Sequence, residues 1–156
     1  MYPVYELPPF KIFTDPAKAD VAAIHAYLSR DSYWAENIPL EIVIRSVQNA
    51  LCFSVYANEK QIGFARVITD KTTFAYLCDV YILEEFRGNG LSKWLMACIQ
   101  NHPDLQHLRR FMLATKDAHG LYAQFGFKPI VAPERLMEIV NREIYNTPLS
   151  EALEKR

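Results

Sequence analysis

The amino-acid sequence predicts a single α/β (α+β) domain, a mixed central sheet of about six or seven strands flanked by about four helices. Three observations predict it. Two segments before residue 51 carry apolar residues at helical spacing, three strand-like runs joined by short turns follow, and helical and strand-like segments then alternate to about residue 131. With 156 residues the chain has the usual length of one domain, so we expect residues 1–156 to share one core.

The amino-terminal third is expected to hold an arm, a short strand and two helices. Residues 1–10 are rich in Pro and Tyr and predict an arm that leads into a strand at Phe10–Phe13. Asp15 followed by Pro16 is typical of a helix N-cap and the first helical position. The first helix then shows one apolar face, and a second helix runs to about Ala50. The residues that mark these two faces are Val21, Ile24, His25 and Leu28, then Leu40, Val43, Ile44, Val47 and Leu51.

The middle of the chain predicts an antiparallel meander. Three runs rich in β-branched and aromatic residues are separated by turns of hairpin length, at residues 58–60 and 69–71. We expect their strands to neighbour one another in sequence order. The runs are Cys52–Ala57, Gln61–Thr69 and Thr72–Leu83.

Helices and strands alternate in the last part. A helix is expected from Leu91 to about Asn101, then a strand at Arg110–Ala114 and a helix that starts near Thr115 or Lys116. Gly126 ends that helix, and Phe127–Val131 predicts a further strand. The pattern of Arg135–Ile144 fits a strand or a helix, and the tail from Asn146 is expected to be loose.

Composition narrows the class of function. The net charge of −1 argues against a nucleic-acid partner, which needs a basic face. No apolar run approaches the roughly 18 residues that span a bilayer, and the first residues show no secretory signal. Cys52, Cys78 and Cys98 lie in apolar stretches, as expected for reduced thiols of a cytoplasmic protein. We expect no membrane partner, and no metal because His and Cys do not cluster.

The segment Arg87-Gly88-Asn89-Gly90 follows a strand and opens directly into a helix. Backbone N–H groups of such a turn, added to the free donors of the helix N-terminus, can hold a phosphate. Glycines permit positive φ and close approach. A tight turn that starts the helix without any ligand is the alternative. The Walker A pattern is absent, and strands linked by hairpins argue against a dinucleotide-binding βαβ unit.

Two motifs resemble the GNAT superfamily of acyl-CoA-dependent N-acyltransferases. Residues 76–100 resemble its motif A, Gln/Arg-x-x-Gly-x-Gly/Ala, either from Glu85 with an acidic first position or from Arg87 with Ser92 in the last position. Residues 121–127, Leu-Tyr-Ala-Gln-Phe-Gly-Phe, resemble the family's Leu-Tyr-x-x-x-Gly-Phe, with Thr115 where the family often has Asn. The resemblance covers a core of about residues 10–131.

The resemblance implies a GNAT fold and the transfer of an acetyl group from acetyl-CoA to a primary amine within a ternary complex. It places the pantetheine arm along the backbone of residues 80–82, where the Ile82 N–H polarises the thioester carbonyl. Tyr122 matches the general acid that protonates the thiolate, although a buried aromatic on a helix face is the alternative. The implied cofactor-binding residues are Val80, Tyr81, Ile82, Arg87, Gly88, Asn89, Gly90, Leu91 and Ser92.

Asp79 is the candidate for a general base or base relay, because it is an acidic residue inside a strand just before the thioester position. A structural or water-orienting role is the alternative, and a shift of one residue in register would turn its side chain to the other face. Tyr33, Trp34, Phe74 and Tyr76 are candidates for an aromatic wall that binds the amine by packing and cation–π contact. Core filling is the alternative for these aromatic residues, and it is favoured for Phe74 and Tyr76.

The favoured function is acetylation of a small-molecule amine. Two alternatives stay open: a non-catalytic module that binds or senses acetyl-CoA, and acetylation of a protein N-terminus or lysine. Retention of Tyr122 favours an enzyme, whereas Ser92, Thr115 and the lack of an obvious glutamate base leave room for a sensor. A homodimer is compatible with the sequence, which does not determine the oligomeric state.

Overall fold

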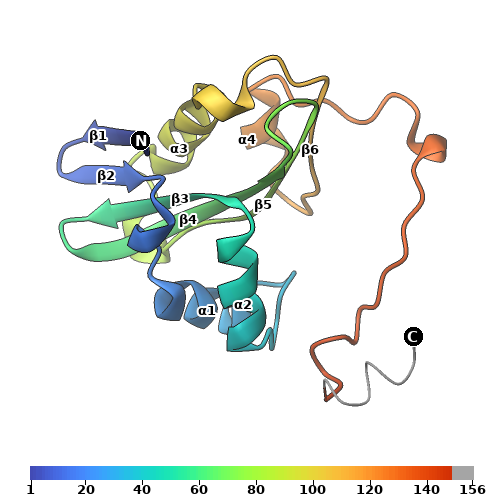
Figure 1. Ribbon diagram of the computed structural model, residues 1–156, viewed down its shortest axis with the longest axis horizontal. Coiled ribbons are helices and arrows are strands. Elements are labelled where there is room, and N and C mark those ends of the chain that lie inside the picture. The colour runs from blue at the N-terminus through green and yellow to red at the C-terminus, as the bar shows by residue number, and fades with distance from the viewer. Residues whose placement is uncertain (149–156) are drawn as a thin grey trace.

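The computed structural model describes residues 1–148 and is built on one six-stranded mixed sheet (Figure 1). The strands lie in the order of the sequence. Each of the first five is antiparallel to its neighbour, and the last is parallel to the fifth. The strands are β1 (Val4–Leu7), β2 (Phe10–Phe13), β3 (Leu51–Ala57), β4 (Lys60–Thr69), β5 (Phe74–Ile82) and β6 (Arg110–Leu113). The predicted meander and the predicted α/β class are both confirmed.

Helices cover both faces of the sheet (Figure 1). On one face, α1 (Val21–Arg30) and α2 (Leu40–Gln48) enclose a core that includes Ile24, Val43 and Phe64. On the other, α3 (Leu91–Gln100) and α4 (His119–Ala123) enclose a larger core around Phe53, Leu95 and Met96. Single 3-10 turns lie at Pro16–Lys18, Glu84–Phe86, Pro103–Leu105 and Pro133–Arg135.

The amino terminus differs from the prediction in two details. Residues 4–7 form β1 rather than an arm, because the two prolines at 8 and 9 lie in the turn between β1 and β2. Asp15 does cap a helical turn, with its carboxylate accepting from the Ala17 N–H at 2.9 Å, but that turn is the 3-10 turn at 16–18. The cap of α1 is Asp20, whose carboxylate accepts from the Ala23 N–H at 3.0 Å.

The strand predicted at Phe127–Val131 does not form. The Phe127 N–H donates to the Tyr122 carbonyl at 3.2 Å, and the Phe127 ring packs edge-on against Phe111, so the chain turns beside α4. From residue 128 it leaves the sheet (Figure 1). Beyond the turn at 133–135, residues 136–144 form neither helix nor strand. Most of the tail predicted to be loose, residues 149–156, lies outside the described residues.

Candidate active site

A β-bulge in β5 shapes the candidate site. Phe64 pairs with Tyr81 and Arg66 pairs with Cys78, so Asp79 and Val80 together oppose the single residue between Phe64 and Arg66 on β4. Asp79 has φ 53°, in the left-handed region. Such a bulge adds one residue to a strand and re-aims the side chains that follow it.

The effect of the bulge is seen in the core to which each side chain of β5 belongs. Ala75 and Leu77 belong to the core under α3 and α4, whereas Tyr81 belongs to the core under α1 and α2. All three would point the same way in a regular strand, because side chains alternate with a period of two. The bulge therefore turns Asp79 away from the apolar core under α3, where an unpaired carboxylate would be costly.

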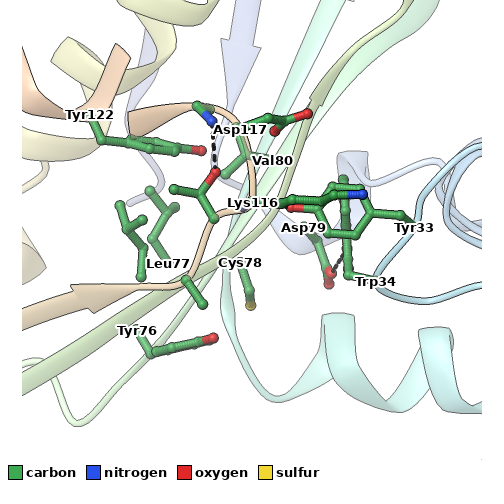
Figure 2. Close-up of a pocket in the computed structure, with 14 residues that line it drawn as sticks. Tyr33, Trp34, Tyr76, Leu77, Cys78, Asp79, Val80, Lys116, Asp117 and Tyr122 are labelled. Atoms are coloured by element: carbon green, nitrogen blue, oxygen red, sulfur yellow. Dashed lines mark hydrogen bonds between the residues drawn. The ribbon is translucent and has the colours of Figure 1, made fainter. Parts of the chain in front are cut away.

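Asp79 is held by two donors on the α1–α2 face of the sheet. Trp34 Nε1 donates to Asp79 Oδ1 at 3.0 Å (Figure 2). Arg66 Nε donates to Asp79 Oδ2 at 2.7 Å. The Arg66 and Asp79 side chains are 16% and 9% exposed. The carboxylate is thus a fixed, paired group at the edge of a cavity, with lone pairs left for a further donor.

The cavity lies where β5 and β6 part. The two strands pair only from Phe74 to Leu77 on β5, opposite Arg110–Leu113 on β6. Beyond this point they enclose a cavity of about 370 Å³. Residues 76–80 line one side, residues 113–118 line the other, and Tyr33, Trp34 and Tyr122 complete the wall (Figure 2). We call this space the acceptor cavity.

Tyr122 extends its ring from α4 to the acceptor cavity (Figure 2). It is 8% exposed and packs edge-on against Phe127. Burial, with smaller contributions from the nearby Tyr33 and Asp117, raises the pKa of the Tyr122 phenol to about 12. The phenol therefore keeps its proton at neutral pH and can donate it to a basic leaving group.

The loop between α1 and α2 brings two predicted aromatic residues to this cavity. The Tyr33 hydroxyl accepts from the Lys116 N–H at 3.0 Å, and the Lys116 ammonium lies over the Tyr33 ring at 5.5 Å. Trp34 stacks edge-on against Tyr33 and also holds Asp79. These contacts fix the loop across the space between the two parted strands.

The two aromatic residues of β5 are placed differently. Tyr76 lines the acceptor cavity. Phe74 does not line this cavity: it is the first residue of β5 and is 38% exposed. Of the four aromatic residues predicted to bind the amine, Tyr33, Trp34 and Tyr76 therefore line the acceptor cavity.

The glycine turn at residues 87–90 leads into α3 as the sequence predicts. Gly88 and Gly90 have φ of 83° and 72°, and an added Cβ would meet nothing within 4 Å at either position. The glycines are thus required by backbone conformation rather than by crowding. Gly90 is the N-cap of α3 and supplies no side-chain cap, so the first N–H groups of the helix remain open to an external acceptor.

Side chains of this turn serve mainly to shape it. Arg87 Nε donates to the Ile82 carbonyl at 3.0 Å and Asn89 Nδ2 donates to the Phe86 carbonyl at 2.9 Å. Leu91 is 2% exposed and packs in the core. Any anion at this turn would meet main-chain groups, together with the half-buried side chain of Ser92 or the exposed side chain of Lys93.

The open edge of β5 presents the Ile82 peptide. The Leu83 N–H donates to the Ile62 carbonyl at 2.8 Å, and hydrogen-bonding groups alternate in direction along an antiparallel strand. The Ile82 N–H therefore points to the opposite edge, toward the gap between β5 and β6. The side chains of Tyr81 and Ile82 are buried, so these residues offer backbone groups only.

The three cysteines are free thiols. Cys52 and Cys98 are buried, as the sequence predicts, and Cys78 is partly exposed at the acceptor cavity. Burial, together with the neighbouring Asp79 carboxylate, raises the pKa of the Cys78 thiol to about 12. Cys78 is therefore protonated at neutral pH and is not a nucleophile. Within residues 1–148, no three His, Cys, Asp or Glu side chains cluster to hold a metal, and no helix is long and apolar enough to cross a membrane.

Sequence reasoning missed three residues at the site. Arg66 pairs with Asp79, and Lys116 and Asp117 line the rim of the acceptor cavity. A signal for Arg66 exists: it is a lone cation inside an apolar strand, and such a charge needs a partner on a neighbouring strand. The lone anion of the next predicted strand is Asp79. Lys116 and Asp117 carry no comparable signal, since charged residues are common before a helix.

Residues 48–129 match the family described as an acetyltransferase (GNAT) domain. A protein of Gibberella zeae, named as a candidate acetyltransferase, is 34% identical over 138 residues, with 74% of this chain and 76% of that protein covered. These matches confirm the resemblance found in the two sequence motifs.

Solved structures agree. A candidate GNAT-family acetyltransferase from Xanthomonas campestris is 49% identical and superposes with a TM-score of 0.88, covering 91% of this chain and 100% of that one. A candidate acetyltransferase from Clostridium acetobutylicum, solved with acetyl-CoA, is 12% identical with a TM-score of 0.58, covering 90% and 95%. The second likeness concerns the fold alone.

Proposed function

The chain belongs to the GNAT family of acyl-CoA-dependent acetyltransferases, and on that premise we propose that it acetylates a small primary amine bound in the acceptor cavity, by direct attack in a ternary complex. The observation that carries the proposal is the parting of β5 from β6. It creates an open strand edge beside a cavity that Asp79 and Tyr122 both line. The family uses acetyl-CoA as its acetyl donor.

The chain's own groups fit acetyl-CoA at three places. Open N–H groups at the start of α3, together with the turn at Gly88 and Gly90, suit a pyrophosphate. The free edge of β5 suits the amide groups of a pantetheine arm, which would pair with it as a strand does. The Ile82 N–H, directed into the same gap, would donate to the thioester carbonyl oxygen as negative charge develops there.

Tyr122 is proposed as the general acid. Its phenol is protonated at neutral pH because burial raises its pKa to about 12. Burial in this cavity also raises the pKa of a thiol, as it does for Cys78, to about 12. A thiolate that leaves in the same cavity is therefore about as basic as the Tyr122 phenolate, and the proton transfer is close to balance.

Asp79 is proposed to position the incoming amine or a water rather than to act as a free base. Its carboxylate is already paired with Arg66, so the two charges largely cancel. The remaining lone pairs can accept a hydrogen bond from the amine nitrogen, while a water chain along the cavity carries its proton to solvent. Tyr33, Trp34 and Tyr76 would pack against the apolar part of the acceptor. A volume of about 370 Å³ suits a small molecule.

The proposal is tested by release of CoA thiol from acetyl-CoA over a panel of small amines, with short peptides alongside. Turnover of at least one small amine, falling by about 10²–10⁴-fold in Tyr122→Phe, supports both the substrate class and the acid role. Tyr2→Phe, on the exposed amino terminus, is the matched control.

Three other outcomes contradict parts of the proposal. Turnover of peptides alone would make the acceptor a protein. Acetyl-CoA binding without turnover of any acceptor would indicate a sensor. Full activity in Tyr122→Phe would remove the phenol from the chemistry.

A further inference from the structure

An apolar segment near the carboxyl terminus lies outside the core. We call residues 128–143 the strap. Every strap residue except Ala132 is exposed. Val131, Met137 and Ile139 are 100%, 98% and 106% exposed, and Figure 1 shows the strap running well clear of the sheet and helices. A row of large, fully exposed apolar side chains marks an interaction surface.

The strap is attached at both ends. At its start the Phe127 ring packs against Phe111. Just after its end, Asn37 Nδ2 donates to Asn146 Oδ1 at 2.9 Å, and Tyr145 packs against the core under α1 and α2. The strap is therefore an arch between two anchored points, and its middle is exposed in the part of the chain that the structure describes.

The same chain contains a groove that a strand would fill. A cavity of about 360 Å³ lies between residues 111–115, which include the end of β6, and residues 127–130, with α4 as its floor. β6 pairs with β5 on one edge, and its other edge meets no strand within residues 1–148. We call this cavity the β6 groove. Its walls are two stretches of chain, one of them an edge strand, and such an edge is a template for another strand.

We propose that residues 136–140 of a second copy occupy the β6 groove and extend the sheet, in a two-fold dimer that exchanges its straps. Leu136-Met137-Glu138-Ile139-Val140 has four apolar residues in five, and Leu136 already has an extended backbone, φ −98° and ψ 139°. Five residues in a strand span roughly 16 Å, which matches the length of residues 111–115. Each copy offers one strap and one groove, so a two-fold axis satisfies both at once.

The exchange would also complete the candidate active site. The β6 groove and the acceptor cavity share Leu113, Ala114, Thr115 and Tyr122. A strand from the second copy would thus pack against the side of Tyr122 that faces away from the acceptor cavity. It would close that side to solvent and support the position of the ring.

The proposal is tested by measuring the molar mass in solution, by light scattering after size-exclusion chromatography. Three proteins are compared: the wild type, a double variant in the strap and a control variant. The wild type is expected at twice the mass of one chain. The double variant Met137→Asp/Ile139→Asp is expected at the mass of one chain. It should still unfold in one cooperative thermal transition, since both side chains are exposed within a single chain. Leu40→Asp, at a 44% exposed apolar residue that begins α2, is the matched control and is expected to remain a dimer.

Hydrogen exchange identifies the surface involved. The amides of residues 136–140 are expected to be protected in the wild type and to exchange at least 10-fold faster in the double variant. A monomeric wild type would overturn the proposal, whether or not its strap amides are protected, because protection in a monomer would mean that the strap fills its own groove. A double variant that stays dimeric would overturn it as well.

Discussion

Arg66 donates through Nε to Oδ2 of Asp79 at 2.7 Å, across the β4–β5 pair and at the position where β5 bulges. The ion pair and the bulge depend on one another. Without the extra residue in β5, the Asp79 side chain would point toward the core under α3, and Arg66 would face the α1–α2 side without a counter-charge. The pair is thus the local reason for an irregular strand at the candidate site.

This relationship predicts strong coupling between the two residues. Asp79→Asn keeps a residue that tolerates positive φ and removes the charge, and Arg66→Met keeps the aliphatic stem. Each single change is expected to lower the free energy of unfolding by about 2–4 kcal/mol, somewhat less than for a fully buried pair. The double variant is expected to lose clearly less than the sum, as measured by urea unfolding in a double-mutant cycle.

The exposed pair Lys60–Glu85 serves as the control for this cycle. Its N–O distance is 3.2 Å, and its side chains are 61% and 59% exposed. Lys60→Met and Glu85→Gln are expected to show no resolvable coupling, because water and salt screen such pairs. Additive effects of the Arg66 and Asp79 changes would mean that the two charges are solvated independently.

Sequence patterns were sufficient for most of the sheet, because its strands are long, apolar and joined by short turns. The bulge at Asp79 was not predictable in the same way. Residues 74–82 read as one regular strand, and whether a residue is inserted depends on the register against β4, which only the pairing shows. The sequence therefore identified Asp79 as a candidate but not the direction of its side chain.

The error at Phe127–Val131 has a different cause. Its apolar residues are typical of a strand, yet a strand also needs a neighbour with free hydrogen-bonding groups. Here the β6 groove separates residues 127–130 from the edge of β6. The local sequence pattern does not show whether this segment can reach the free edge of β6 or whether a groove separates the two. The glycine turn, in contrast, was predictable in full, since both positive φ values occur at glycines.

The second prediction concerns the turn before α3. Gly90→Ala places a Cβ on a residue with φ 72° but meets no neighbour, so its cost is conformational, about 1–2 kcal/mol. If the turn binds pyrophosphate through its backbone, the Kd for acetyl-CoA should rise about 10-fold, measured by titration calorimetry. Gly120→Ala is the matched control, because Gly120 lies in α4, has open space around it and has no positive φ. An unchanged Kd in Gly90→Ala would place the cofactor phosphates elsewhere.

The third prediction concerns Arg87, which positions a backbone group. Its guanidinium donates to the Ile82 carbonyl and, at 3.4 Å, to the Tyr27 hydroxyl. Loss of these donors should let the Ile82 peptide turn, so kcat for acetyl transfer should fall about 10-fold in Arg87→Ala. Arg87→Lys should not restore it, since an ammonium lacks the forked geometry. A change in KM for acetyl-CoA alone, with kcat unchanged, would instead indicate direct contact with the cofactor.

The last prediction is a pH dependence. Burial raises the pKa of Tyr122 from 10.0 to about 12. The proton is therefore held more tightly in the folded state than in the unfolded state. This difference contributes stability that is fully present below pH 10 and is lost as the pH rises toward 12.

The acid form of Tyr122 should likewise persist through pH 10, so kcat should show no descending limb from this residue between pH 7 and 10. Ultraviolet titration at the tyrosinate band, wild type against Tyr122→Phe, measures the group directly. A difference curve with a midpoint near 10 would show that the ring is solvated, and burial could then no longer explain how the phenol keeps its proton.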